Sequence, residues 1–383
     1  MEDSALIRYG KFLSSLISSV VLGTALPSPF EGLDWKKLFY LAKKQGVAVM
    51  VYPVVKKMNL PEDDMLLFEK NKHRMVARTT RQNIEAETVM SMLDANSIRY
   101  IRLKGSHIKR MYPFDYLRTF TDVDLCISES DREKARPVME SLGYTISNIT
   151  DYHDEYEKDE FFIFELHSHI VSPVASYSSV FDSPFTKAVP VEGSEYCYEL
   201  NNEYLYLHLF FHLYKHFTAT GCGIRLFADL LVYENYIDNP DWNFIESVIK
   251  EHNMFSFYIT VKKLIRYFFY GEPFDKNIVA IAEYIFKNEP TGLYQHHVAS
   301  LGFWGKIKYF LKNWFPSAKD LAFRYPVLEK APVLLPVCWL RRIFYSLFFN
   351  RSAFKEQAQS IRTASSEEYK LIKKIRQTAE NPK

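Results

Sequence analysis

The chain has 383 residues, 48% of them hydrophobic, and carries 48 Lys and Arg against 46 Asp and Glu. This length and apolar fraction support a large buried core and exclude global disorder. Its cysteines form no CxxC pair, which argues against a disulfide framework or a cysteine-rich zinc site and favours a reducing, cytoplasmic compartment. They are Cys126, Cys197, Cys222 and Cys338.

The nearly neutral charge balance hides an asymmetry. Residues 301–383 contain 16 Lys and Arg but 6 Asp and Glu, whereas residues 1–300 contain 32 and 40. The C-terminal region is therefore basic as well as aromatic. It could meet an anionic partner such as nucleic acid or a membrane surface, giving a peripheral membrane location, or it could cover the acidic body of the same protein.

From residue 4 to about 95 the pattern predicts helices, over 35–58 and 65–93 in particular, because apolar residues recur three and four positions apart. The uncharged stretch 12–30 has the same periodicity and is interpreted as an amphipathic helix rather than a secretory signal. Near the other end, the apolar stretch 333–349 is interrupted by Pro336, Arg341 and Arg342. We therefore expect an interfacial or core helix there and no transmembrane segment.

Short β-rich runs follow residue 95, at 98–104, 122–127, 144–149 and 161–167. A helix is expected between Asp131 and Gly143, with Pro137 either kinking it or delaying its start. The acidic run 151–160 has the composition of a solvated hairpin. After about residue 200 the helical pattern returns, at 201–217 and 224–236, and persists to the end.

These patterns predict an α+β protein in which a small mixed sheet with helices is flanked by mainly α-helical N- and C-terminal regions. The predicted boundaries are a helical region at 1–95, the mixed unit at 96–190, a helical domain at 191–300 and the basic, aromatic-rich helical region at 301–383.

Acidic side chains are predicted to gather on one face of the sheet. Asp122 and Asp124 share one face of the run 122–127, and Glu165 and His167 share one face of the run 161–167. Carboxylates that face one another repel unless cations compensate them, and Mg²⁺, or Mn²⁺ in its place, prefers such hard oxygen ligands. Upstream, Gly105 and Ser106 end a strand and open a helix, where free backbone N–H groups suit a phosphate.

The chain carries the runs LKGSHIKRMYP, TDVDL, ELH and LHLFFHLYKH, the last followed by a helix with Arg225 and Asp229. In this order they resemble the bacterial "uncharacterised nucleotidyltransferase" family within the DNA polymerase β-type nucleotidyltransferase superfamily. The resemblance covers roughly residues 95–235 and implies a polymerase β-like palm at 96–190.

By this resemblance Asp122, Asp124 and Glu165 would be the catalytic metal ligands. Gly105 and Ser106 would form the triphosphate-binding turn. Lys104 and Arg118, which match basic positions of the narrower family, are assigned to the phosphates.

Several polar residues have more than one interpretation. His208, His212 and His216 share one helix face, and a zinc site is less expected there than helix packing or contact with the active-site cleft. His167 could orient Glu165, contact substrate or make only a supporting hydrogen bond. Arg225 and Asp229 could pair on the helix surface, or Arg225 could reach into the cleft with Asp229 holding it.

The function expected from these features is Mg²⁺-dependent transfer of an NMP from an NTP such as ATP to an unidentified acceptor, by a two-metal mechanism. The acceptor could be a small molecule, a protein or an RNA. Two alternatives stay open. One is a non-catalytic nucleotide-binding or scaffolding protein, and the other is a toxin-like enzyme that modifies tRNA or protein.

Overall fold

The computed structural model describes residues 4–150, 152–159, 162–219, 221–287, 325 and 327–341. The chain divides into two compact units. Among the described residues, the first unit contains those up to 214 and from 222 to 287, and the second contains 215–219, 221, 325 and 327–341. Most of the basic region 301–383 thus lies outside the described residues, as does much of the apolar stretch 333–349.

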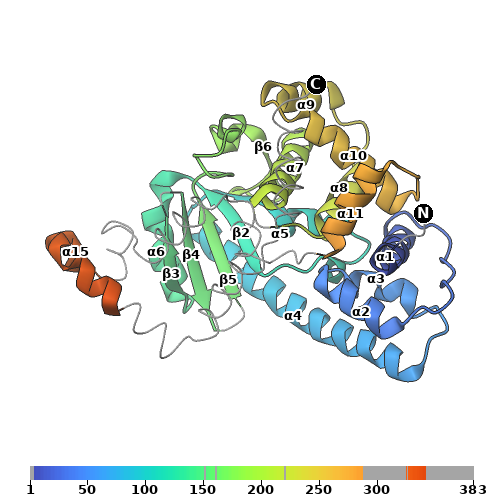
Figure 1. Ribbon diagram of the computed structural model, residues 1–383. Coiled ribbons are helices and arrows are strands. Elements are labelled where there is room, and N and C mark those ends of the chain that lie inside the picture. The colour runs from blue at the N-terminus through green and yellow to red at the C-terminus, as the bar shows by residue number, and fades with distance from the viewer. Residues whose placement is uncertain are drawn as a thin grey trace. The chain divides into compact units, whose positions relative to one another are not determined.

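The N-terminal helices of the first unit match the expected helical region (Figure 1). They are α1 (Ala5–Val21), α2 (Trp35–Lys44), α3 (Ala48–Val55) and the long α4 (Glu62–Ala95). Leu13, Leu16 and Ile17 are fully buried, which confirms an amphipathic α1 packed on a core. The rest of the uncharged stretch, from residue 22 to 30, is not helical, since α1 ends at Val21. The single helix expected at 35–58 is two helices, because the chain turns at Gly46, whose φ is +70°.

The centre of this unit is a seven-stranded mixed sheet with the order β3-β4-β5-β2-β1-β7-β6. Its strands are β1 (Tyr100–Arg102), β2 (Asp122–Ile127), β3 (Thr145–Ile149), β4 (His153–Lys158), β5 (Phe162–His167), β6 (Ala188–Pro190) and β7 (Cys197–Leu200). Strands β2 and β5 pair in parallel, as do β1 and β7, while the other neighbours are antiparallel. The α+β class is confirmed.

Strand β4 contradicts the interpretation of 151–160 as a solvated hairpin. Its polar sequence forms a strand because it pairs with β5 along its whole length, and because Tyr156 and Asp154 are buried. Asp154 can be buried there since it forms a salt bridge with Arg132, whose side chain is also buried. Strand β7 lies beyond residue 190, so the sheet continues past the boundary predicted for the mixed unit.

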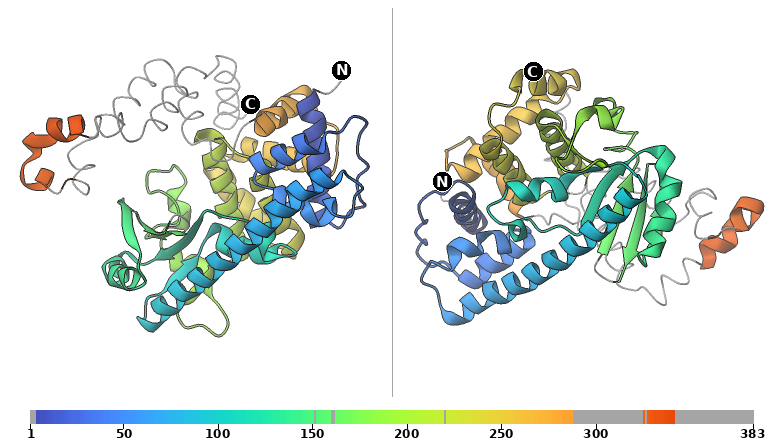
Figure 2. Two further views of the ribbon diagram at one scale, coloured as in Figure 1. Left: turned by 90° about the horizontal axis from the view of Figure 1, so that it is seen from below. Right: turned by 180° about the vertical axis from the view of Figure 1, so that it is seen from behind.

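One face of the sheet is covered by helices. Ala86, Val89 and Leu93 of α4 and Ala135, Val138 and Met139 of α6 (Arg132–Ser141) belong to one buried cluster with Val123, Leu125, Ile127, Phe164 and Leu166. Figure 2 shows α4 running along the sheet. Helix α6 continues through Pro137 without a delayed start. This packing leaves the alternate residues of β2 and β5 for the opposite face.

Between β1 and β2 the chain forms α5 (Lys104–Ile108) and two short 3₁₀ turns, η1 (Lys109–Met111) and η2 (Asp115–Leu117). Further 3₁₀ turns are η3 (Glu129–Asp131), η4 (Ser178–Phe181) and η5 (Pro184–Lys187). The later helices are α7 (Asn202–Ala219), α8 (Ile224–Tyr236), α9 (Trp242–Glu251), α10 (Phe255–Phe269) and α11 (Lys276–Lys287). Helices α7 and α8 lie where the sequence predicted them.

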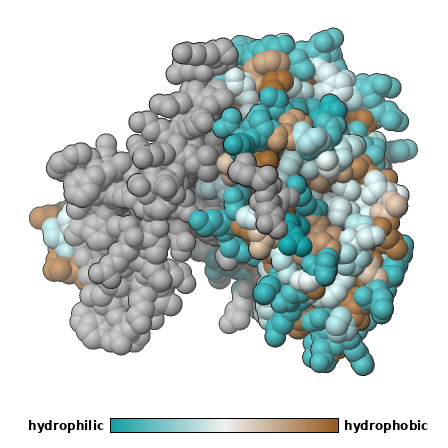
Figure 3. All heavy atoms as spheres, turned by 45° about the vertical axis from the view of Figure 1, so that its right-hand side comes forward, coloured by the Kyte–Doolittle hydropathy of each residue, from teal (hydrophilic) through white to brown (hydrophobic). Residues whose placement is uncertain are grey.

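In the second unit, α15 (Val327–Lys330) and η6 (Pro332–Leu334) accompany a small cluster in which Leu328 and Cys338 are buried. In the part of the chain that the structure describes, no helix combines the length and the apolar character needed to cross a membrane. Hydrophobic side chains on the described surface seen in Figure 3 are scattered among hydrophilic ones.

Candidate active site

Strand register brings the predicted carboxylates together. In the parallel pair of β2 and β5, Asp124 lies opposite Glu165, and Asp122 lies two residues earlier on the same face of β2. Val123 and Leu125 point into the core on the other side. The alternation expected from the sequence is therefore observed, and it places these carboxylates on the face away from α4 and α6.

Asp124 is the most enclosed of these groups, with a side chain only 4% exposed. Its Oδ1 accepts a hydrogen bond from Lys104 Nζ at 2.6 Å and lies 3.0 Å from His167 Nε2. His167 Nε2 also lies 3.1 Å from Glu165 Oε2. Lys104 and His167 thus supply the positive charge and hydrogen bonds that let neighbouring carboxylates coexist.

The pKa shifts follow from this arrangement. Burial alone would raise the pKa of Asp124, but Lys104 and His167 lower it below its usual value. Burial raises the pKa of Asp122, and the nearby charge of Asp124 raises it further. For Glu165, burial alone would raise the pKa, but the hydrogen bond from His167 and the charges of Lys104 and His167 together lower it. The Asp122 carboxyl is therefore the least compensated of the three.

A metal fits the donor set. Among the described residues, Asp124, Glu165 and His167 each place one ligand atom within 4.8 Å of the others. Two carboxylates with an imidazole suit a divalent cation, and Asp122 adds a further oxygen donor on the same face. Because His167 contacts both carboxylates, it supports them directly, which is one of the roles that the sequence left open for it.

The acidic run 151–160, which the sequence analysis interpreted as a solvated hairpin, supplies a fourth carboxylate. Glu155 of β4 lies opposite Glu165 in the antiparallel pair and shares its face. Burial and the nearby charge of Glu165 raise the pKa of Glu155. Sequence reasoning did not single out Glu155, because β4 is mostly polar and its alternating burial is visible only in the structure. The acidic face thus extends across β2, β5 and β4.

The turn that contains Gly105 and Ser106 follows β1 directly. Lys104 adopts a φ of +42°, which is strained for a residue with a side chain. Ser106 Oγ donates to Leu103 O at 2.6 Å. A Cβ on Gly105 would lie 3.3 Å from Phe120 Cβ, so a side chain there would press on the segment that leads into β2. Glycine therefore fits this turn without displacing Phe120.

Arg118 is held inside the protein by Asp229 of α8. Its Nε and Nη2 donate to the two carboxylate oxygens of Asp229 at 2.7 and 2.8 Å, and its Nη1 donates to Thr119 O. Tyr112 Oη donates to the same carboxylate at 2.7 Å. Asp229 therefore fastens the segment 112–119, which precedes Asp122, to α8.

Arg225 contacts the same segment, since its Nη1 donates to Thr119 O at 3.2 Å. Burial and, next to it, the nearby charge of Arg118 lower the pKa of Arg225 to about 10. One alternative from the sequence was that Arg225 pairs with Asp229 on the helix surface. This pairing does not occur, because Asp229 is buried and faces Arg118.

The histidines of α7 differ in their surroundings. His208 is 1% exposed, and its Nδ1 has no hydrogen-bond partner. Burial lowers its pKa to about 3, with Lys104 as the next cause, so this imidazole is neutral and close to the carboxylate site. His212 is partly buried one turn further along. The sequence allowed these histidines to contact the active-site cleft, and His208 does lie close to the carboxylate site.

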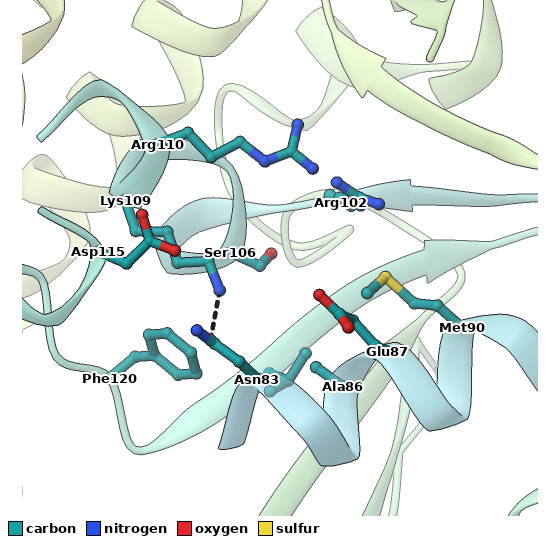
Figure 4. A pocket seen from close by; sticks show the side chains of 11 residues that line it. Asn83, Ala86, Glu87, Met90, Arg102, Ser106, Lys109, Arg110, Asp115 and Phe120 are labelled. Carbon is teal, nitrogen blue, oxygen red and sulfur yellow. Dashed lines mark hydrogen bonds between the residues drawn. The ribbon is translucent and has the colours of Figure 1, made fainter. Parts of the chain in front are cut away.

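A cavity of about 140 Å³ lies beside the turn, on the α4 side of the sheet (Figure 4). Its lining includes Ser106 and Val123, and Lys109 Nζ donates to Asn83 Oδ1 at 2.6 Å within it. Arg110 and Arg102 also line it, and both pair with Glu199 of β7. The cavity touches the predicted phosphate turn through Ser106, while the carboxylates face the other side of β2.

Three comparisons with known proteins complete the description. No curated protein sequence matches the chain. A solution structure of the antibiotic-resistance factor ANT(2'')-Ia is similar to 48% of this chain and 97% of its own, at 12% identity and a TM-score of 0.36, values too low to support an argument. The model of a family described as "Uncharacterised nucleotidyltransferase" matches residues 31–270, more than half of the chain, and includes every residue of the carboxylate site. The chain therefore belongs to the uncharacterised nucleotidyltransferase family.

Proposed function

We propose that the protein transfers an NMP from an NTP, with ATP as the expected donor, to an acceptor hydroxyl, and that Asp122, Asp124 and Glu165 form the reaction centre. Family membership supports nucleotidyl transfer as the general activity. The observation that carries the finer proposal is the buried group of Asp124, Glu165 and His167 with Asp122 beside it. Lys104 and His167 offset part of this negative charge, and a bound cation would offset the rest.

Asp122, Asp124 and Glu165 would hold Mg²⁺, or Mn²⁺ in its place, with His167 beside them. When bound, the cation supplies positive charge that offsets the phosphate oxygens of the nucleotide. His167 keeps Asp124 and Glu165 in place, because its Nε2 lies within 3.1 Å of an oxygen of each. These residues therefore orient the reacting α-phosphate, and the main demand of this chemistry on a protein is such positioning.

The backbone at Gly105 and the Ser106 side chain would accommodate the phosphates that leave as pyrophosphate. Lys104 would contact the same phosphates. Arg118 has its donors occupied by Asp229 and Thr119, so we assign it to positioning the segment before Asp122 rather than to direct nucleotide contact. The bond formed joins the acceptor oxygen to the α-phosphorus, and the bond broken joins that phosphorus to the bridging oxygen of the pyrophosphate.

Isothermal titration of ATP in the presence of Mg²⁺ tests the site. The wild type should bind, and Asp122→Asn/Asp124→Asn should lose metal-dependent binding. A matched control is Asp63→Asn/Asp64→Asn, which removes two carboxylates from the first turn of α4. Equal metal-dependent binding of ATP by the wild type and the Asp122/Asp124 variant would mean that these carboxylates do not form the binding site. Repeating the titration with the other NTPs identifies the preferred donor.

A further inference from the structure

Lys104 occupies the position in which a cation is needed. Its Nζ lies 2.6 Å from Asp124 Oδ1, the same oxygen that His167 Nε2 approaches at 3.0 Å. The Lys104 side chain is 19% exposed and that of Asp124 is 4% exposed. An ammonium and a divalent cation that both require this enclosed carboxylate are therefore competitors.

The neighbouring basic side chains are engaged elsewhere. Arg118 is paired with Asp229, Arg110 with Glu199, and Lys109 donates to Asn83. None of these partners belongs to the carboxylate group of Asp122, Asp124 and Glu165. Within the part of the chain that the structure describes, Lys104 is thus the lysine or arginine whose ion pair a cation at Asp124 would disturb.

The backbone at Lys104 is consistent with a residue that changes partners. Its φ of +42° is strained for a residue with a side chain, and it lies at the junction of β1 and α5. Gly105 and Ser106, the predicted phosphate turn, follow immediately. A long, flexible lysine stem can exchange a carboxylate for a phosphate over a short distance without a change of fold.

We propose that Lys104 pairs with Asp124 when no cation is bound, and that a divalent cation displaces the Lys104 ammonium from Asp124. The displaced ammonium then binds the phosphates of the nucleotide. This inference rests on the proposed function. It makes cation and nucleotide binding cooperative, since the nucleotide contact of Lys104 becomes available only after the cation arrives.

The first measurement is the reactivity of Lys104 toward acetic anhydride in the wild-type protein, followed by mass spectrometry. Saturating Mn²⁺ without nucleotide should raise acetylation of Lys104 several-fold, and ATP added with Mn²⁺ should lower it again. Lys109, whose partner is Asn83, is the internal control and should not respond to Mn²⁺. Unchanged or reduced reactivity of Lys104 in Mn²⁺ would overturn the proposal.

The second measurement is Mn²⁺ affinity without nucleotide, read by electron paramagnetic resonance. Lys104→Met should bind Mn²⁺ about tenfold more tightly than the wild type, because the competing charge is gone. Lys109→Met should match the wild type, and thermal melting should show that both variants fold. Equal or weaker binding by Lys104→Met contradicts the exchange while leaving the proposed function intact. A wild type that binds no Mn²⁺ contradicts the proposed function and, with it, this inference.

Discussion

The buried ion pair between Arg118 and Asp229 gives the most quantitative prediction. Both side chains are almost fully buried, and the Asp229 carboxylate accepts two hydrogen bonds from Arg118 and one from Tyr112. Asp229→Ala would leave the guanidinium in the interior without its anion. Removing one partner of such a pair costs about 3–5 kcal/mol, because the remaining charge is buried and uncompensated.

Urea denaturation followed by circular dichroism measures this loss as a decrease in the free energy of unfolding. The matched control is Glu246→Ala, which removes the exposed ion pair with Lys250 on α9. The free energy of unfolding of that variant should decrease by about 0.3–0.5 kcal/mol. Replacing both members of the buried pair, as in Arg118→Met/Asp229→Leu, should recover much of the loss, because no buried charge then remains.

A second consequence concerns the site itself. Asp229 fastens the segment 112–119, and this segment leads directly to Asp122. Asp229→Ala should therefore weaken ATP binding in the presence of Mg²⁺ even at temperatures where the variant is folded. If Asp229→Ala lost no more stability than Glu246→Ala, the ion pair between Arg118 and Asp229 could not be enclosed as described.

Three further predictions concern the site and its surroundings. Gly105→Ala should cost about 1–3 kcal/mol of stability, since its Cβ would press on Phe120 at 3.3 Å, and it should weaken ATP binding in titration calorimetry. Glu155→Gln should stabilise the metal-free protein by about 0.2–1 kcal/mol in urea denaturation with EDTA, because it removes a like charge opposite Glu165; a loss of stability would contradict this. His208 has its pKa lowered to about 3, so between that pH and about 6.5 the unfolded chain binds more protons at this site than the folded protein. Stability should therefore fall as pH falls through this window, by up to about 1.4 kcal/mol per pH unit from this residue, and His208→Phe should flatten that slope.

The strands that carry the site could be predicted where burial imposes alternation. Val123, Leu125 and Ile127 must reach the core, which fixes β2 at its observed bounds and puts Asp122 and Asp124 on the other face. The same reasoning applies to Glu165 on β5. In contrast, the polar composition of β4 indicates a solvated hairpin and not a strand with buried side chains. Its structure depends on pairing with β5 and on the Arg132 partner of Asp154, neither of which local sequence reveals.

Long-range contacts account for the other differences. Asp229 and Arg225 are four residues apart, so the sequence suggested a local pair, yet Asp229 binds Arg118, which is 111 residues away. The contact between Lys104 and Asp124 depends on a left-handed backbone at Lys104, a conformation that residue type does not predict. The position of His208 near the carboxylate site likewise depends on how α7 is rotated against the sheet.

We propose that the carboxylate site of this member of the uncharacterised nucleotidyltransferase family transfers an NMP, which contains the α-phosphate of the NTP. The most direct test incubates the protein with a cell extract, Mg²⁺ and each NTP labelled at either the α- or the γ-phosphate, and identifies labelled products by mass shift. We predict that an acceptor gains label from the α-position and none from the γ-position. Asp122→Asn/Asp124→Asn should abolish this incorporation, while Asp63→Asn/Asp64→Asn should retain it. Transfer of γ-label, or equal incorporation by the wild type and the Asp122/Asp124 variant, would mean that this site does not transfer an NMP.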